Sequence, residues 1–275
     1  MKLCRNKRLA SIAIILGMTI LGLIFVMPYI WMILSSFKGK VEIIKSKAFL
    51  PSKWIWDNYI TVFTKAPIVS WFFNSVFVTV VGTVAMLFTS SIAGFVFAKY
   101  EFRFKNALFL FVLATMMVPA QVTMIPSFLL IDRLGMYDSL SALIIPGLVG
   151  GFGIFLCRQF IEDIPDSLCE AACIDGANGF YIYARIIVPL IKAAIGALTI
   201  FTFLAKWNDY LGPLLFLSNP KNMTMPLALN FFTGQHNSDN GAIMAAAVIV
   251  TLPVTIVFLC LQKQFIKGIA IAGMK

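Results

Sequence analysis

Charged residues are scarce in this chain, and so are the patterns that enzymes use. Only 12% of its 275 residues are Asp, Glu, Lys or Arg, whereas 60% are hydrophobic and the mean hydropathy is +0.91. No Gly-x-x-x-x-Gly-Lys-Ser/Thr loop occurs, so the sequence lacks the usual cradle for the phosphates of ATP. The single histidine, His236, has no cysteine or carboxylate cluster around it, which argues against a metal site and against catalysis. We therefore predict neither an enzyme nor a soluble domain.

The cysteines and the net charge of +10 point to no further chemistry. Three of the five cysteines lie in or beside apolar runs, where a thiol behaves as a small hydrophobic group. Cys169 and Cys173 are four residues apart, but two thiols without a further ligand make no convincing metal site. No basic face with interleaved aromatic residues occurs, so the positive charge indicates membrane flanks and not a nucleic-acid partner.

Six long runs carry almost no charge, and each comes close to the length of a bilayer crossing. A helix of about 20 apolar residues spans the hydrocarbon core. In lipid, a single segment can form all of its backbone hydrogen bonds internally only as a helix. The sequence therefore predicts an all-α integral membrane protein with six transmembrane helices. The runs are residues 9–37, 66–98, 106–131, 139–157, 186–205 and 240–262.

The first run is expected to stay as a membrane helix. Basic residues precede it, as in a signal peptide, but the run is longer than a signal peptide's apolar region and no small-x-small cleavage site follows. An even number of crossings places both termini on one side of the membrane. A slight excess of Lys and Arg on that side makes it the cytoplasm, although charge alone argues this only weakly.

Two of the runs carry features that predict how their helices pack. Thr79, Gly82 and Thr83 would let another helix approach closely. The third run contains Pro119 and Pro126 with Gln121 between them. Because proline frees a backbone carbonyl, we expect a kinked and partly hydrated helix there, with Gln121 as a candidate for a solute pathway.

The loop at about residues 162–189 has the layout of a short helix pair at the membrane surface. Ser167-x-x-Glu170 matches a capping box with Ser167 as the N-cap, and Gly176 would end the first helix. A second helix is expected to begin near Gly179 and to end where Pro189 marks the fifth membrane helix. Its apolar residues form one stripe that a cytosolic partner could cover, namely Phe180, Tyr183, Ile187 and Leu190.

The same loop resembles a known motif. Its sequence is Glu170-Ala171-Ala172, three residues, Gly176, nine residues, then Ile186-x-Val188-Pro189. This is similar to the E-A-A-x3-G-x9-I-x-L-P loop of ABC importer permeases, with Val188 as a mild departure, and Asp175-Gly176-Ala177 also fits. The resemblance implies a type I ABC importer permease fold in which this loop is the cytoplasmic coupling helix that docks on an ATPase. The implied coupling residues are Glu170, Ala171, Ala172, Asp175, Gly176, Ala177, Ile186 and Pro189.

A second element narrows the resemblance to carbohydrate permeases. The run from Trp207 to Leu214 reads WNDYLGPL and is similar to the W-N-[DE]-[FY]-L-x-P-L element of the maltose-type second-permease branch. Residues 244–253 and 262–275 are similar too, and the resemblance covers about residues 70–275. Two interpretations of the element stay open. Asp209 can form an ion pair with Lys206 at the interface, or Asn208 and Asp209 can bind sugar beside Trp207.

The resemblance implies partners and a location. We expect a second homologous permease, two ATP-binding subunits that use ATP and Mg, and an extracytoplasmic solute-binding protein, in a bacterial cell membrane. This chain itself is expected to bind no cofactor. The predicted regions are 1–69, a transmembrane domain at 70–262, and a cytoplasmic tail at 263–275. Alternatives are a permease for glycerol phosphate, polyamines or amino acids, or a self-sufficient secondary transporter, which usually carries ionisable residues at mid-membrane.

Overall fold

The computed structural model describes residues 2–46, 48–233 and 239–272. Within these residues every regular element is a helix. The chain forms two compact units, residues 1–66 with 228–252 and residues 67–227 with 253–275. The boundaries predicted for the transmembrane domain, at 69/70 and 262/263, stay a prediction. Helix α15 continues through part of the expected tail, as far as Ala272.

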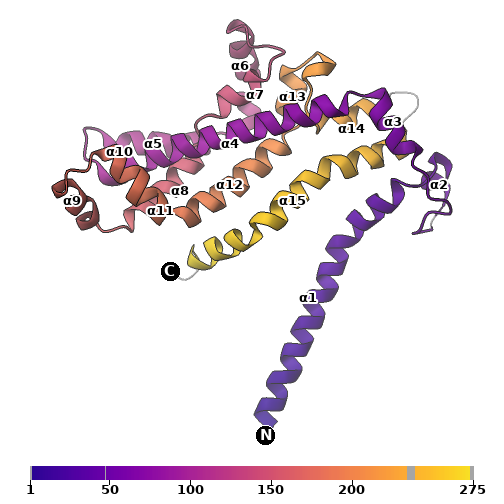
Figure 1. Ribbon diagram of the computed structural model, residues 1–275, viewed down its shortest axis with the longest axis horizontal. Coiled ribbons are helices and arrows are strands. Elements are labelled where there is room, and N and C mark those ends of the chain that lie inside the picture. Colours follow the sequence, from indigo (N-terminus) through magenta and orange to yellow (C-terminus); the bar gives the residue numbers. More distant parts are fainter. Residues whose placement is uncertain (1, 47, 234–238, 273–275) are drawn as a thin grey trace. The chain divides into compact units, whose positions relative to one another are not determined.

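Among the described residues, three helices are long and apolar enough to cross a membrane without a break, and they are labelled in Figure 1. They are α1 (Lys2–Ser35), α4 (Ile68–Lys99) and α15 (Asn240–Ala272). Their apolar stretches match the first, second and last of the predicted runs. Pro28 and Pro253 lie inside α1 and α15.

The other three predicted runs form pairs of helices that meet at a bend. Helices α5 (Lys105–Met116) and α6 (Ala120–Arg133) meet at 99°, where Pro119 is the N-cap of α6. Helix α7 (Ser141–Ile144) continues into the 3-10 turn η1 (Ile145–Gly147), which meets α8 (Gly151–Glu162) at 40°. The segment Gly179–Leu190 meets α12 (Lys192–Trp207) at 80°. The described residues thus hold up to six crossings if each bent pair is one span.

Short helices make up the rest. In the first unit they are α2 (Lys40–Lys45), α3 (Asp57–Lys65) and α14 (Leu227–Phe232), the last of which begins at the boundary between the units. In the second unit they are α9 (Asp166–Ile174), α10 (Gly179–Tyr181), α11 (Val188–Leu190), α13 (Leu211–Phe216) and the 3-10 turn η3 (Pro220–Asn222).

In the first unit, a loop after α1 is held by buried polar side chains. The side-chain amide of Asn58 donates to the carbonyl oxygens of Ser36 and Lys38, at 2.7 and 2.9 Å. The buried ammonium of Lys38 donates to the carbonyl oxygen of Ala48 at 2.7 Å. These bonds satisfy groups that would otherwise be buried without partners.

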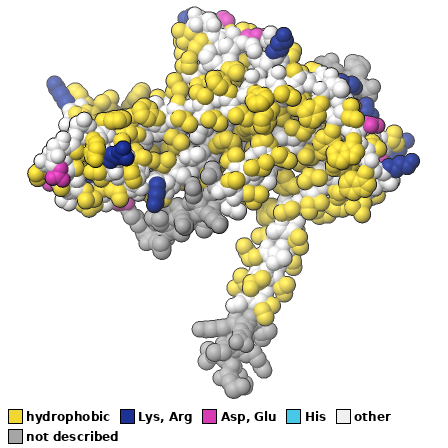
Figure 2. All heavy atoms as spheres, in the orientation of Figure 1, with side chains coloured by type: hydrophobic (Ala, Val, Ile, Leu, Met, Phe, Trp, Pro, Cys, Tyr) yellow, Lys and Arg dark blue, Asp and Glu magenta, His cyan; other side chains and the backbone are white. Residues whose placement is uncertain are grey.

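In the second unit, the core forms where α4 packs on α8 and α12. A Cβ added to Gly94 on α4 would lie 2.7 Å from the Cβ of Cys157 and 2.8 Å from the backbone N of Arg158, so only glycine allows this approach. Thr79, Gly82 and Thr83 are buried on α4, which confirms their predicted packing role. Hydrophobic side chains cover most of the face in Figure 2, as expected of a surface that meets lipid.

Candidate functional site

The first half of the candidate site is the short helix α9, which begins the loop at residues 165–190, here called the helix-pair loop. Pro165 is the N-cap of α9 and no side chain caps it. The predicted capping box is therefore wrong. The N-cap position is Pro165, two residues earlier than expected, so Ser167 lies inside the first turn, where its hydroxyl cannot act as N-cap. The acidic residue of that turn is Asp166, which favours the helix N-terminus.

The end of α9 is as predicted. Gly176 has φ +85°, a conformation that glycine adopts without strain. The backbone N–H of Ala177 donates to the carbonyl oxygen of Ala172 at 2.9 Å, and that of Gly176 to Cys173 at 3.0 Å. This pair of bonds is a Schellman motif, which satisfies the last carbonyls of the helix and turns the chain sharply.

The second half begins at Asn178, whose side-chain oxygen accepts a hydrogen bond from the backbone N–H of Tyr181 at 2.8 Å. Sequence reasoning placed the start of this helix near Gly179 but missed Asn178 as its N-cap, although asparagine is among the preferred residues there. The helix then passes through a π-helical turn, η2 (Ile182–Ile187), before α11.

The predicted apolar stripe is wrong because of the π-helical turn. Its i→i+5 bonds change the register along the helix, so the four residues are not equally exposed. Tyr183 and Ile187 are buried in the chain's own core, packed with residues of α4, α8 and α12, whereas Phe180 is 66% and Leu190 55% exposed. The stripe is therefore not a surface for a partner.

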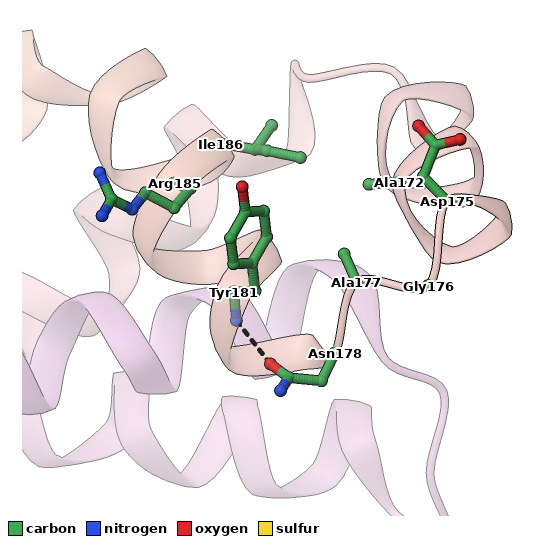
Figure 3. Close-up of a pocket in the computed structure, with 8 residues that line it drawn as sticks. All are labelled: Ala172, Asp175, Gly176, Ala177, Asn178, Tyr181, Arg185 and Ile186. Carbon is green, nitrogen blue, oxygen red and sulfur yellow. Dashed lines mark hydrogen bonds between the residues drawn. The ribbon is translucent and has the colours of Figure 1, made fainter.

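A hollow of about 540 Å³ lies where the two halves meet. Figure 3 shows Ala172 of α9 and Asp175 at the end of that helix on one side, and the second helix on the other, joined by the turn at Gly176. The structure brings together five of the eight predicted coupling residues in this hollow. Its lining consists of Ala172, Asp175, Gly176, Ala177, Asn178, Tyr181, Arg185 and Ile186.

The other three predicted coupling residues lie elsewhere on the loop. Glu170 and Ala171 are exposed on α9, which buries none of its side chains. Ile174 on the same helix is 87% exposed. Pro189 instead lines a separate hollow of about 600 Å³ with residues of α11 and α12. It lies two residues before the 80° bend, where a missing N–H favours a break.

The helix-pair loop is charged at its attachment to α4. The ammonium group of Lys99 forms an ion pair and a hydrogen bond with the carboxylate of Asp166. This hydrogen bond and the charge of Lys99 hold the pKa of Asp166 below its ordinary value. Burial raises the pKa of the Cys169 thiol on the same helix. Cys169 and Cys173 are both free thiols, and His236 lies outside the described residues.

The second predicted site, at residues 206–209, has a different geometry from the one expected. Trp207 is 1% exposed, and its ring stacks on Phe203 with centroids 6.0 Å apart. Asn208 and Asp209 are exposed. The ion pair of Asp209 with Lys206, one of the two interpretations, is not among the ion pairs within 4.0 Å of the described residues, and the aspartate accepts from the backbone N–H of Gly212 at 3.1 Å.

Lys206 itself lies against glycines in the same unit. A Cβ added to Gly82 would be 2.8 Å from its Cε, and one added to Gly147 would be 2.5 Å from its Nζ. Gln121 is exposed on α6, and no hydrogen bond between described residues joins it to residues 207–209. The role of the four predicted pathway residues stays a prediction.

Comparison with known proteins assigns the family. Residues 87–271 match the family described as "Binding-protein-dependent transport system inner membrane component". The chain is 35% identical to the arabinooligosaccharides transport system permease protein AraQ of Bacillus subtilis (strain 168), over 96% of this chain and 95% of that protein. It is 29% identical to the lactose transport system permease protein LacG of Rhizobium radiobacter, over 96% of each chain.

A solved structure agrees with these relatives. A chain of a bacterial ABC transporter involved in the import of the acidic polysaccharide alginate superposes with a TM-score of 0.84 at 25% identity, over 94% of this chain and 97% of that one. This match confirms the predicted fold of an ABC importer permease, and the relatives are permease subunits and not ATPases. The chain belongs to the family of binding-protein-dependent transport system inner membrane components.

Proposed function

We propose that this chain is the membrane permease subunit of an ATP-driven importer for a sugar or oligosaccharide. The relatives named above transport arabino-oligosaccharides and lactose, and the solved neighbour belongs to an importer of alginate. The WNDYLGPL element supports the same class of solute. In this proposal the chain forms half of the translocation pathway, and a partner subunit hydrolyses the ATP.

The observation that carries the coupling role is the exposure of α9. None of the nine side chains of α9 is fully buried, and only Cys169 and Ala172 pack on the core, whereas exposing Ile174 at 87% costs free energy in water. The Schellman turn at its end and the ion pair of Asp166 with Lys99 at its start nevertheless hold this helix in place. A rigid helix with an uncovered apolar side chain fits a surface that another protein covers.

We assign the docking surface to α9 and the neighbouring hollow. Glu170 and Ala171 would contact the ATPase from the helix, and a side chain of the ATPase would enter the hollow. Pro189 would act at a distance, by setting the bend into α12. The residues assigned to the hollow are Ala172, Asp175, Gly176, Ala177 and Ile186.

The proposed complex contains a second homologous permease, two ATP-binding subunits and an extracytoplasmic solute-binding protein. The family description names dependence on a binding protein. A second solved structure, 13% identical and alike in fold with a TM-score of 0.67, is an alginate ABC transporter in complex with a pentasaccharide-bound periplasmic protein. ATP and Mg would be bound by the ATPase and not by this chain. The helix-pair loop and both termini would then lie in the cytoplasm.

For the solute, we propose that Asn208 and Asp209 contact the passing sugar, since both are exposed beside the buried Trp207. Trp207 would support this site by packing and would not stack on the sugar in this conformation. Gln121 on α6 is a further candidate.

Uptake by the reconstituted complex tests this function. This chain is co-expressed with its partner permease, the ATPase and the binding protein, and labelled solutes are offered to proteoliposomes that contain the complex. We expect ATP-dependent uptake of an oligosaccharide and none of glycerol phosphate. Uptake of glycerol phosphate alone would overturn the choice of sugar. Uptake by this chain alone, driven by an ion gradient without ATP, would identify a secondary transporter instead.

A further inference from the structure

The last residue of α4, Lys99, joins three parts of the second unit through one ammonium group. Its side chain is only 7% exposed. Its Nζ donates to the carbonyl oxygen of Ile164, in the turn after α8, and to the carboxylate of Asp166, in the first turn of α9. The beginning of the helix-pair loop is thus tied to the end of α4 by a side chain that lies 65 residues away from Ile164 along the chain.

This ion pair differs from the others in the structure. Of the four ion pairs between described residues, Lys105 with Glu101 and Arg158 with Glu162 are four residues apart and hold no two helices together. The fourth, between Lys40 and Asp239, belongs to the first unit. Exposed ion pairs contribute little to stability. Lys99, however, is largely buried, and without its ammonium group the carbonyl oxygen of Ile164 would lose a hydrogen-bond donor.

The other end of α4 is joined by hydrogen bonds to a loop that is distant in the sequence. Trp71 Nε1 donates to the carbonyl oxygen of Pro220, and Asn74 Nδ2 donates to those of Lys221 and Met223, at 2.8 and 2.9 Å. The hydroxyl of Ser75 accepts from the backbone N–H of Met225 at 2.7 Å. Since α4 is continuous over 32 residues, about 36–42 Å of helix separates residues 71–75 from Lys99.

We propose that Lys99 is a positioning residue that passes movement of α9 into α4, and that α4 carries it to the loop at residues 218–225. This inference rests on the proposed docking of the ATPase on the helix-pair loop. Lys99 makes the one side-chain ion pair that joins α4 and α9 among the described residues, so its loss leaves α9 less firmly coupled to α4 when the ATPase moves it. Binding of the ATPase would persist, but hydrolysis would no longer drive transport.

The test compares variants in the complete importer, reconstituted with its partners. Lys99→Met keeps the apolar stem and removes the ammonium, and Lys99→Arg keeps a charged donor. Glu101→Gln is the matched control, since it removes a neighbouring ion pair that joins no helices. We measure the ATP hydrolysed per sugar imported and the amount of ATPase that co-purifies.

Lys99→Met is expected to bind the ATPase normally and to consume at least about fivefold more ATP per sugar, the lower end of usual coupling between sites. Lys99→Arg and Glu101→Gln should stay near the wild-type ratio. Hydrogen exchange at residues 218–225 gives a second measurement. It should change on ATP binding in the wild type but not in Lys99→Met, and a role in stability alone would not remove that response.

Three results would overturn the proposal. One is a wild-type ATP-to-sugar ratio in Lys99→Met, and another is an unchanged ATP response at residues 218–225. The third is loss of the ATPase from Lys99→Met, because Lys99 would then shape the docking surface itself. Each of these leaves the proposed function standing. Failure of the ATPase to bind the wild-type chain would instead overturn the proposed function.

Discussion

The hydroxyl groups of Ser91 on α4 and Tyr183 in the π-helical turn lie 2.8 Å apart in the protein interior. Ser91 also lies 2.7 Å from the carbonyl oxygen of Leu87 and can give it its only hydrogen. Tyr183 then donates to Ser91. This bond joins the helix-pair loop to α4 in the same region as Lys99, and it fixes the turn whose register the sequence did not reveal.

Removing the hydroxyl of Tyr183 and removing that of Ser91 should lower the free energy of unfolding by different amounts. Tyr183→Phe keeps the ring and leaves Ser91 bonded to Leu87, so it should lower the free energy of unfolding by about 0.5–1.5 kcal/mol. Ser91→Ala leaves the buried tyrosine hydroxyl without a partner and should cost about 1–3 kcal/mol. Thermal unfolding of the purified complex in detergent measures both. An equal or larger loss for Tyr183→Phe would contradict the assigned direction of the bond.

Gly94 should be intolerant of even a methyl group. Gly94→Ala would place its Cβ 2.7 Å from that of Cys157 and 2.8 Å from a backbone nitrogen, which cannot move aside cheaply. Overpacking of this kind costs about 1–3 kcal/mol. The control is Gly22→Ala on α1, where nothing lies within 4 Å and alanine favours the helix. A melting temperature for Gly94→Ala at or above that of the wild type would show that α4 and α8 do not pack so closely.

Asp138 should make the loop at residues 218–222 sensitive to acid. Its carboxylate accepts from the backbone N–H groups of Asn219 and Ser218, at 2.9 and 3.0 Å, and these bonds hold its pKa below the ordinary value. Because the folded pKa is the lower one, the stabilisation is fully present above the unfolded pKa of about 3.9. It is lost as the pH falls through the folded pKa.

Oxidation by hydroxyl radicals can report this opening through the nearby Met225, which is fully buried. In the wild type we expect oxidation of Met225 to rise only below about pH 4. In Asp138→Ala it should already be high at neutral pH. Oxidation that is equally low in the variant at neutral pH would show that the carboxylate does not hold the loop.

The features that sequence reasoning predicted correctly depend on short stretches of chain. The six apolar runs follow from the thickness of a bilayer, and each is found as a span or a bent pair. Gly176 was identified as the end of a helix because few other residues adopt its positive φ. The motif around Glu170 then indicated the family, which the comparison confirmed.

The features that were missed depend on contacts between distant residues. The π-helical turn forms where Tyr183 and Ile187 pack on α4 and α8, and no local pattern marks it. The capping box failed because Pro165 starts α9 earlier than expected. The pair of Lys99 and Asp166 is 67 residues apart, so only the fold reveals it. Asn178 is different, since its residue type could have identified it as an N-cap.

The central claim is that the helix-pair loop binds the ATPase, and a matched pair of glycine variants tests it. Gly176 and Gly135 both have positive φ, at +85° and +67°, and neither has an atom within 4 Å of an added Cβ. Valine at either position should cost about 1–2 kcal/mol through backbone strain alone. Only Gly176→Val also changes the angle at which α9 meets a partner. Glu170→Lys tests the same surface by reversing a charge.

The measurement is the amount of ATPase that co-purifies with each permease variant at equal expression in the membrane. We predict that Gly176→Val and Glu170→Lys lose most of the ATPase and the sugar uptake, whereas Gly135→Val retains both. Glu170→Gln should fall between Glu170→Lys and the wild type. Undiminished binding of the ATPase by Gly176→Val and Glu170→Lys would contradict the claim that this loop is the coupling element.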